Sequence, residues 1–177
     1  MNKILLSACL LDHPVRYDGK SKTLLDSTLD QLLAQDRVIS FCPEIAGGLP
    51  VPRAAAEIHA GDGTDVIAKR ARVKTQGGTD VSEYFLSGAR QALALCQQHN
   101  IMVAVLTESS PSCGSNQIYD GSFTGNPIPG SGVTAALLKQ HGVKVFNQYQ
   151  LGAAFRHLES RDSITPPRKL NSMQGTK

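Results

Sequence analysis

The sequence lacks the features that mark membrane and secreted proteins. It has 177 residues, and none of its apolar runs is long enough to span a bilayer. The N-terminal apolar stretch is interrupted by Asp12, His13 and Pro14, and no small-residue cleavage pattern follows. We therefore interpret this stretch as a first strand, not as a secretion signal, and expect a cytoplasmic protein without membrane contact.

Several ligand-binding signatures are also absent. The chain has neither the spaced-glycine fingerprint of dinucleotide binding nor a phosphate-loop lysine, which argues against nicotinamide and nucleoside triphosphate ligands. Its four cysteines contain no C-x-x-C pair, which argues against a zinc ribbon or a thioredoxin-like motif. Four cysteines without an export signal indicate a reducing compartment, where disulfides are rare. The net charge of +3 is too small to argue for nucleic-acid binding.

Short apolar runs alternate with segments of helical periodicity along most of the chain. Strands are expected at residues 3–7, 38–41, 102–106 and 143–146, and helices at residues 24–34, 80–99, 132–140 and 151–158. This alternation predicts one three-layer, Rossmann-like α/β domain with a mostly parallel sheet and a site at the carboxyl ends of the strands. The domain is expected to cover residues 1–159, followed by a disordered polar tail at 160–177.

The local signals within this pattern are less uniform. Asp80 and Glu83 resemble a capping box at the start of the longest helix. Ser131 is expected to cap the helix that follows it. Residues 66–73 fit either a strand or an extended connection, and residues 107–130 form a long loop rich in Ser, Gly and Pro. Loops of this length inside a domain are usually functional.

Three of the four cysteines follow runs of strand type. Cys9, Cys42 and Cys113 each lie where an expected strand gives way to a loop. Because the carboxyl ends of parallel strands form the floor of a ligand crevice, these thiols are expected to meet there. Cys96 instead lies on the apolar face of a helix and is interpreted as a core residue. The pattern predicts a shared metal or iron–sulfur site.

The residues alone leave the identity of the metal open. Thiolates select zinc, copper(I) or iron–sulfur clusters. A structural zinc needs a fourth ligand, and the candidates His13 and His59 do not lie at comparable junctions. A catalytic zinc with three sulfur ligands is a second option. A cubane cluster held by three cysteines is a third, and its remaining iron would act as a Lewis acid.

Two carboxylates are candidates for acid–base chemistry. Glu44 follows Cys42 by two residues and is either a solvated loop residue or a general base acting on water. Glu108 is a second candidate, although a glutamate at the end of a strand is commonly structural. The loop from 107 to 114 offers hydroxyl and backbone N–H groups suited to an anion or a carbonyl oxygen.

A phosphate site is a weaker expectation. Residues 130–134 open a helix, and helix N-termini bind phosphate. Arg16, Lys20 and Arg53 lie in the loops after the first two strands and could meet that phosphate. Tyr17 could stack on a base, or simply pack against its own loop.

Five motifs in order resemble a known bacterial family. They are SACLLDHPVRYDG, FCPEIAGGLPVPRAAAE, TESSPSCG, IYDGSF and GSGVTAALLKQHGVKVF. Over residues 3–146 the chain resembles the thiouracil desulfidase family. The resemblance implies a [4Fe–4S] cluster held by only three cysteines, which by matching motif are Cys9, Cys42 and Cys113. Cys96 has no counterpart in the motifs.

The resemblance also implies an activity. This is the non-redox desulfuration of 4-thiouracil or its nucleotide to uracil or a uridine nucleotide plus hydrogen sulfide, with the substrate's sulfur on the open iron. Glu44 is then expected as the acid/base residue, and Ser110 as the catalytic serine that contacts the base. Further substrate-binding residues are expected to be Ser109, Ser112, Arg16 and Tyr17. The expected partners are a small thiolated pyrimidine and the cluster-assembly machinery. Transfer RNA is not expected, because the chain ends without the C-terminal domain of the relatives that resemble transfer-RNA thiouridine erasers.

Two other classes of function compete with this one. A structural or sensory metal protein would bind zinc or a cluster without turnover. A cysteine-nucleophile hydrolase would use Cys113 or Cys42 with Glu44, but no histidine is well placed to act as its base.

Overall fold

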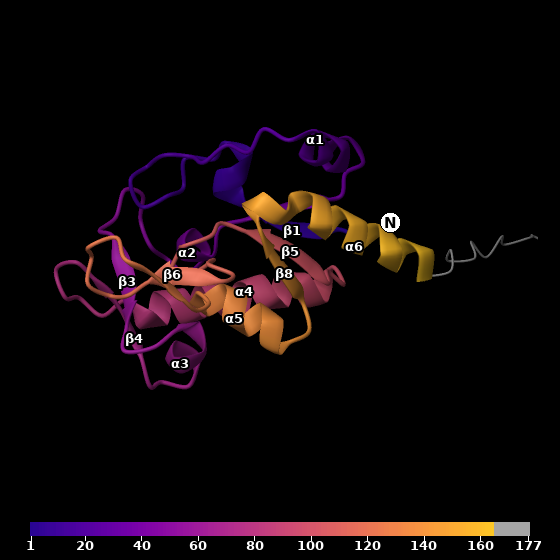
Figure 1. Ribbon diagram of the computed structural model, residues 1–177. Coiled ribbons are helices and arrows are strands. Elements are labelled where there is room, and N and C mark those ends of the chain that lie inside the picture. The colour runs from indigo at the N-terminus through magenta and orange to yellow at the C-terminus, as the bar shows by residue number, and fades with distance from the viewer. Residues whose placement is uncertain (165–177) are drawn as a thin grey trace, which may run out of the picture.

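A four-stranded, fully parallel sheet forms the centre of the fold. The computed structural model describes residues 1–164 (Figure 1). The strand order is β2-β1-β5-β8. These strands are β1 (Ile4–Ser7), β2 (Val38–Phe41), β5 (Val103–Leu106) and β8 (Lys144–Asn147). All four were predicted, and no end is displaced by more than one residue. The chain starts in the sheet's interior, adds β2 on one side of β1, and adds β5 and β8 on the other.

Helices cover both faces of this sheet, as the prediction of three layers requires. Figure 1 shows α1 and α6 on one side and α4 and α5 on the other. These helices are α1 (Ser27–Ala34), α4 (Ser82–Gln98), α5 (Val133–Gln140) and α6 (Leu151–Ile164). Ile4 and Leu6 of β1 point into the core under α1 and α6, whereas Leu5 points into the core under α4 and α5. This alternation is the period of two that a buried strand imposes.

A second group of small elements lies beside the carboxyl edge of the sheet. It contains β3 (Ala56–His59), α3 (Gly63–Ile67), β4 (Arg72–Thr75), β6 (Gln117–Tyr119) and β7 (Pro127–Pro129). The strands form two antiparallel hairpins, β3–β4 and β6–β7. A third apolar cluster, which includes Ile58, Val73, Phe85 and Ile118, joins both hairpins to α4. Short turns of helix complete the described chain: η1 (Ala8–Leu11), α2 (Pro43–Ala46) and η2 (Gln148–Gln150).

Two expectations about loops were wrong. Residues 66–73 contain the end of α3 and the start of β4, and are not one extended segment. Residues 107–130 contain the β6–β7 hairpin. Strands of three residues carry too little apolar periodicity to be recognised in the sequence. The start of α3 did carry a signal, because Asp62 and Asp65 form a capping box.

Both expected caps were also wrong. Val81 precedes the first turn of α4, and the Asp80 side chain accepts a hydrogen bond from Ser82 N at 2.9 Å in place of a capping box with Glu83. Gly132 caps α5, and the Ser131 hydroxyl donates to the carbonyl oxygen of Ser115. Only a glycine fits before α5, because a Cβ there would lie 2.5 Å from the backbone of Ser112.

The last helix runs to Ile164, beyond the expected boundary at residue 159. The part of the expected polar tail from Ser160 to Ile164 is therefore helical, and residues 165–177 lie outside the described residues. The end of this helix is held by Arg37, whose side chain is only 1% exposed. Its guanidinium pairs with Asp162 at 2.6 Å and with Glu159, so two acidic residues of α6 bind the edge of the sheet. Among residues 1–164, no helix combines the length and apolar character needed to cross a bilayer.

The Arg37 pairs generate a prediction about stability. Arg37→Ala should reduce the free energy of unfolding by about 2 kcal/mol, because it removes a packed, buried side chain and its charged hydrogen bonds to Asp162 and Glu159. The measurement is urea-induced unfolding followed by circular dichroism. Lys3→Ala is the matched control, since Lys3 pairs with an Asp36 that is 93% exposed and should change the value by about 0.5 kcal/mol or less. Equal effects of the two substitutions would contradict this role for Arg37.

Candidate active site

Three thiols line one cavity at the carboxyl edge of the sheet. Cys9 lies in η1, directly after β1. Cys42 is the residue between β2 and α2, and Cys113 lies in the loop after β5. All three line a cavity of about 790 Å³, and all are free thiols. β1 and β5 are the adjacent strands between which the order of the sheet reverses. This is the position at which parallel sheets bind their ligands.

The pKa of Cys113 reflects the charged groups around its thiol. Burial raises the pKa of the Cys113 thiol far above its usual value, and the negative charges of Glu44, Cys42 and Cys9 raise it further. Charges act on one another in this way only over short distances. The three cysteines and the carboxylate expected to act with them therefore share one site.

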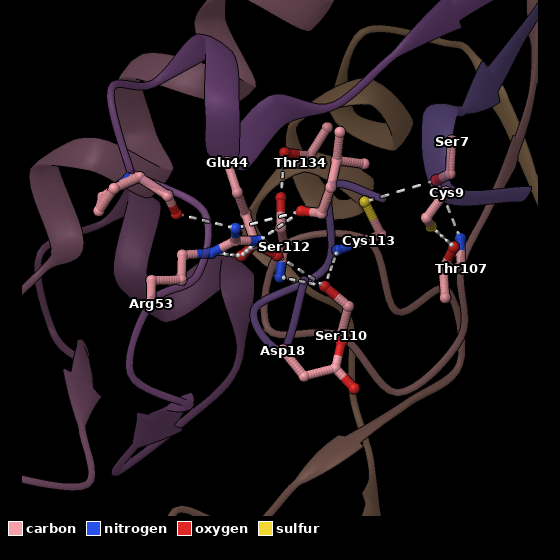
Figure 2. Close-up of polar contacts among 12 residues, drawn as sticks. Ser7, Cys9, Asp18, Glu44, Arg53, Thr107, Ser110, Ser112, Cys113 and Thr134 are labelled. Carbon is pink, nitrogen blue, oxygen red and sulfur yellow. Dashed lines mark hydrogen bonds and ion pairs between the residues drawn. The ribbon is translucent and has the colours of Figure 1, made fainter. Parts of the chain in front are cut away.

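Two of these thiols have hydroxyl partners, as Figure 2 shows. Cys9 Sγ lies 3.0 Å from Thr107 Oγ1, and Ser7 Oγ donates to Cys113 Sγ at 3.7 Å. Burial raises the pKa of the Cys9 thiol, and the Thr107 hydrogen bond opposes that rise. Because hydrogen bonds to sulfur favour the thiolate, they favour the form that binds metals.

Cys42 also has a hydrogen-bond donor for its sulfur, whereas Cys96 has none among the described residues. Burial raises the pKa of the Cys42 thiol, but a hydrogen bond from the backbone N–H of Ile45 in α2 lowers it. At Cys96 burial acts alone and raises the pKa to about 11. Cys96 packs with Ala92 and Leu138 in the core, as expected from its place on the helix. No hydrogen bond to its sulfur opposes the effect of burial, unlike at the three thiols of the cavity.

A single metal ion and an iron–sulfur cluster make different demands on the three thiols. Among residues 1–164, no group of three or more His, Cys, Asp and Glu side chains has the arrangement needed to hold one metal ion. Neither His13 nor His59, the expected candidates for a fourth zinc ligand, lines the cavity. A cubane cluster makes a different demand, because each thiolate binds a separate iron. The three thiols follow three different strands, line one cavity and are free to bind separate irons.

Glu44 is held beside the thiols by an arginine. Arg53 donates to Glu44 Oε2 from Nη2 at 2.6 Å and from Nε at 2.9 Å (Figure 2). Its remaining donors bind the carbonyl oxygens of Val15 and Pro50. Ser110 Oγ lies 3.4 Å from Glu44 Oε1. Arg53 thus occupies one carboxylate oxygen and leaves the other beside Ser110.

Ser110 organises the loop that carries Cys113. Its Oγ accepts hydrogen bonds from Ser112 N at 3.0 Å and Cys113 N at 3.1 Å, so its own hydrogen is free to reach Glu44 or a ligand. Ser112 is fully buried and its hydroxyl bonds Thr134 at 2.9 Å. The expected contact between Ser112 and the substrate is therefore wrong, because this side chain faces α5 and does not line the cavity.

Glu108 is a structural residue in this arrangement. Its Oε1 accepts the backbone N–H groups of Ser115, Asn116 and Gln117, and its Oε2 accepts from Ser115 Oγ and the Asn147 amide. Burial raises the pKa of Glu108, but these hydrogen bonds outweigh it and lower the pKa to about 2. With every lone pair engaged, Glu108 holds the cysteine loop and has no capacity left for acid–base chemistry.

The comparisons with known proteins agree with this geometry. The model of the 2-thiouracil desulfurase family matches residues 4–150. The chain belongs to this family. It is 42% identical over 148 residues to the uncharacterised protein YbbK of Bacillus subtilis (strain 168), a match that covers 84% of this chain and 97% of that protein. It is also similar to the solved structure of the [4Fe–4S]-dependent thiouracil desulfidase TudS, with 45% identity and a TM-score of 0.81. That match covers 93% of this chain and 100% of the other, and confirms both the resemblance and the α/β fold.

The remaining expected site residues divide into two groups. Arg16, Tyr17 and Ser109 line the cavity. The expected phosphate contact of Arg53 is contradicted, because Glu44 and two carbonyl oxygens occupy its donors. Lys20 does not line the cavity.

The start of α5 does not fit the expected phosphate site either. The first N–H groups of the helix donate to carbonyl oxygens of the cysteine loop: Val133 N to Pro111 at 2.9 Å, and Thr134 N to Ser112 at 2.9 Å. These donors are therefore unavailable to an anion.

Two polar residues in the cavity wall were not predicted from the sequence. Glu57 of β3 is 7% exposed and accepts a hydrogen bond from Phe123 N. Gln148 is 5% exposed and accepts from Glu108 N, while its amide nitrogen has no partner among the described residues. Glu57 ends one of the five motifs, but nothing in that motif marked it as a cavity residue, and Gln148 lies outside the motifs. Ser7 was missed as well, although it ends a strand that Cys9 had already marked, and Thr107 was expected only as one hydroxyl of the loop from 107 to 114.

The Glu108 contacts predict a pH-dependent loss of stability. Its folded pKa of about 2 lies below the ordinary 4.5, so the ionised group stabilises the fold above pH 4.5, and this contribution declines as the pH falls towards 2. Glu108→Gln should lower stability at neutral pH by about 1–3 kcal/mol, since buried donors lose their acceptor. The difference between wild type and variant, measured by chemical unfolding, should shrink on acidification. Glu83→Gln, at a 79% exposed position, is the control. A difference that is constant with pH would contradict the assignment.

Proposed function

We propose that this chain is a [4Fe–4S]-dependent desulfidase acting on 4-thiouracil or a 4-thiouracil nucleotide. The products are uracil or the uridine nucleotide and hydrogen sulfide. The observation that supports this most strongly is the placement of Cys9, Cys42 and Cys113 around one cavity together with Glu44. Membership of the 2-thiouracil desulfurase family supports the class of reaction.

Cys9, Cys42 and Cys113 are the proposed ligands of the cluster. Each thiol has a hydrogen-bond donor of its own, which Cys96 lacks. When bound, a cluster with only three protein ligands supplies an open iron, a Lewis acid to which a soft thiocarbonyl sulfur can bind. The protein's own residues must then position a water molecule, move its protons and orient the pyrimidine.

Glu44 is the proposed acid/base residue. Arg53 occupies its Oε2, so Oε1 is the oxygen that can accept a proton from water as the water attacks C4 of the ring. Glu44 then returns a proton to the departing sulfur. The overall change consumes one water and releases one hydrogen sulfide, so no electron is transferred and no redox partner is required.

The pyrimidine is oriented by the residues around the mouth of the cavity. Ser110 is placed to contact the base, since its hydroxyl hydrogen is not committed to the backbone. Ser109, Arg16 and Tyr17 complete the proposed contacts. Tyr17 is 45% exposed, and the Arg16 guanidinium lies 6.0 Å from the centre of its ring. The proposed substrate is a small thiolated pyrimidine in preference to transfer RNA. A cytoplasmic location and loading by the cluster-assembly machinery belong to the same proposal.

A cysteine-nucleophile hydrolase is the weaker alternative. Burial raises the pKa of Cys9, Cys42 and Cys113, whereas a nucleophilic cysteine needs a lowered pKa. No histidine lines the cavity to act as its base.

The function is tested by anaerobic turnover. Protein reconstituted with iron and sulfide should convert 4-thiouracil to equal amounts of uracil and hydrogen sulfide without added reductant. Parallel assays with 2-thiouracil and 4-thiouridine monophosphate establish which sulfur position and which substrate form is preferred. A fully loaded protein that releases no sulfide from any of the three would contradict the proposal and favour a structural or sensory metal protein.

A substitution of Glu44 should abolish most of the turnover without affecting binding of the cluster. Glu44→Gln should retain the iron content and visible absorbance of the wild type, while kcat falls by about 10²–10⁴, the range that general acid–base catalysis contributes. Iron analysis and steady-state kinetics on the same preparation test both parts. Full activity in Glu44→Gln would contradict its role.

Arg53 should affect the chemical step more than substrate binding. Arg53→Lys keeps the charge but loses the two-pronged contact with Glu44, and should lower kcat with little change in KM. Arg16→Ala should instead raise KM, because Arg16 lines the cavity without contacting Glu44. Lys20→Ala, outside the cavity, is the control. If Arg53→Lys raised KM for the nucleotide alone, the rejected phosphate role would be restored.

A further inference from the structure

Ser7 and Thr107 form a small hydroxyl network at the point where β1 and β5 end. Ser7 is the last residue of β1, and Thr107 follows the last residue of β5. Both are buried, with exposed fractions of 2% and 9%. Figure 2 shows them on the same side of the site, with Ser7 directed at Cys113 and Thr107 at Cys9. The proposed catalytic steps use neither hydroxyl.

The direction of each hydrogen bond follows from the other contacts. Ser7 Oγ accepts from the backbone N–H of Thr107 at 3.1 Å, which leaves its hydrogen free to point at Cys113 Sγ, 3.7 Å away. Thr107 Oγ1 and Cys9 Sγ are 3.0 Å apart, and in the free thiol either atom can donate. A thiolate carries no hydrogen, so once Cys9 is ionised Thr107 must be the donor.

This geometry makes Thr107 the centre of the network. Its backbone N–H orients Ser7 toward one sulfur, and its side chain donates to another. Both hydroxyls are shielded from water. Hydrogen bonds to an ionised acceptor are stronger in such a buried environment than at the surface. Cys42 is supplied separately by the backbone of α2, so each of the three thiols has a donor from a different element.

We propose that Thr107 and Ser7 are positioning residues that raise the reduction potential of the cluster and slow its oxidative loss. The inference rests on the ligand set given under the proposed function. Reduction adds one negative charge to a cluster, and donors aimed at its sulfur ligands stabilise the more negative state. They therefore make oxidation harder, which slows loss of the cluster in air.

Three variants of the loaded protein test this. Thr107→Val is isosteric and keeps the backbone N–H but removes the hydroxyl at Cys9, Ser7→Ala removes the one at Cys113, and Thr107→Ser keeps the hydroxyl. Anaerobic titration with dithionite, which adds one electron per cluster, is followed by electron paramagnetic resonance. Thr107→Val and Ser7→Ala should each shift the midpoint to more negative potential, and the double variant should show the sum. Thr107→Ser should match the wild type.

The rate at which the visible absorbance fades in air is a second readout. It should rise about fivefold when one such hydrogen bond is lost. If Thr107→Val cannot hold a cluster while Thr107→Ser loads fully, that outcome also supports the inference.

Unchanged potentials and fading rates in both hydroxyl-free variants would overturn the inference, as would a Thr107→Ser variant that behaves like Thr107→Val. If the wild type cannot be loaded with a cluster, both the proposed cluster ligands and this inference are contradicted. Failure of the proposed function is distinguishable, because a loaded wild type that desulfurates nothing can still show the predicted shifts. Turnover without any shift would retain the function and overturn this inference alone.

Discussion

The pairing of β1 with β2 on one side and β5 on the other determines where chemistry can occur in this molecule. Parallel strands end at the same edge, and the order reverses between β1 and β5, so the segments after them diverge and leave a cavity. Cys9 and Cys113 follow these two strands, and Cys42 follows β2. No local motif links the cysteines, so it is the sheet alone that brings their sulfurs together.

The loops around this cavity are held by polar contacts to the backbone. Glu108 accepts hydrogen bonds from three consecutive N–H groups after Cys113, and Ser110 Oγ accepts one from the N–H of Cys113 itself. Carbonyl oxygens of the same loop accept the first N–H groups of α5. Arg53 joins the segments after Cys9 and Cys42 through Val15 and Glu44. Each clamp satisfies buried donors or acceptors that would otherwise destabilise an irregular loop. The site is thus preorganised by the protein, with Glu44 and the thiols in fixed relation.

The sequence revealed the parts of the structure that repeat or alternate. Buried strands such as Ile4–Ser7 are short apolar runs, and the cysteines that follow them marked the site. It did not reveal contacts between distant segments. Arg53 looked like a free cation, and only the fold shows that Glu44 occupies it. Ser112 is one residue from a predicted ligand, yet its hydroxyl turns to Thr134. The polar end of α6 resembled a tail because its partner, Arg37, lies more than a hundred residues earlier.

The central claim is that three particular sulfurs, and not the fourth, hold the cluster. Iron and acid-labile sulfide per chain, measured after anaerobic reconstitution of the four single Cys→Ala variants, test this most directly. The account predicts about four irons per chain for the wild type and for Cys96→Ala, and loss of the intact cluster in Cys9→Ala, Cys42→Ala and Cys113→Ala. Full loading of any of those three, or loss of the cluster in Cys96→Ala, would contradict it.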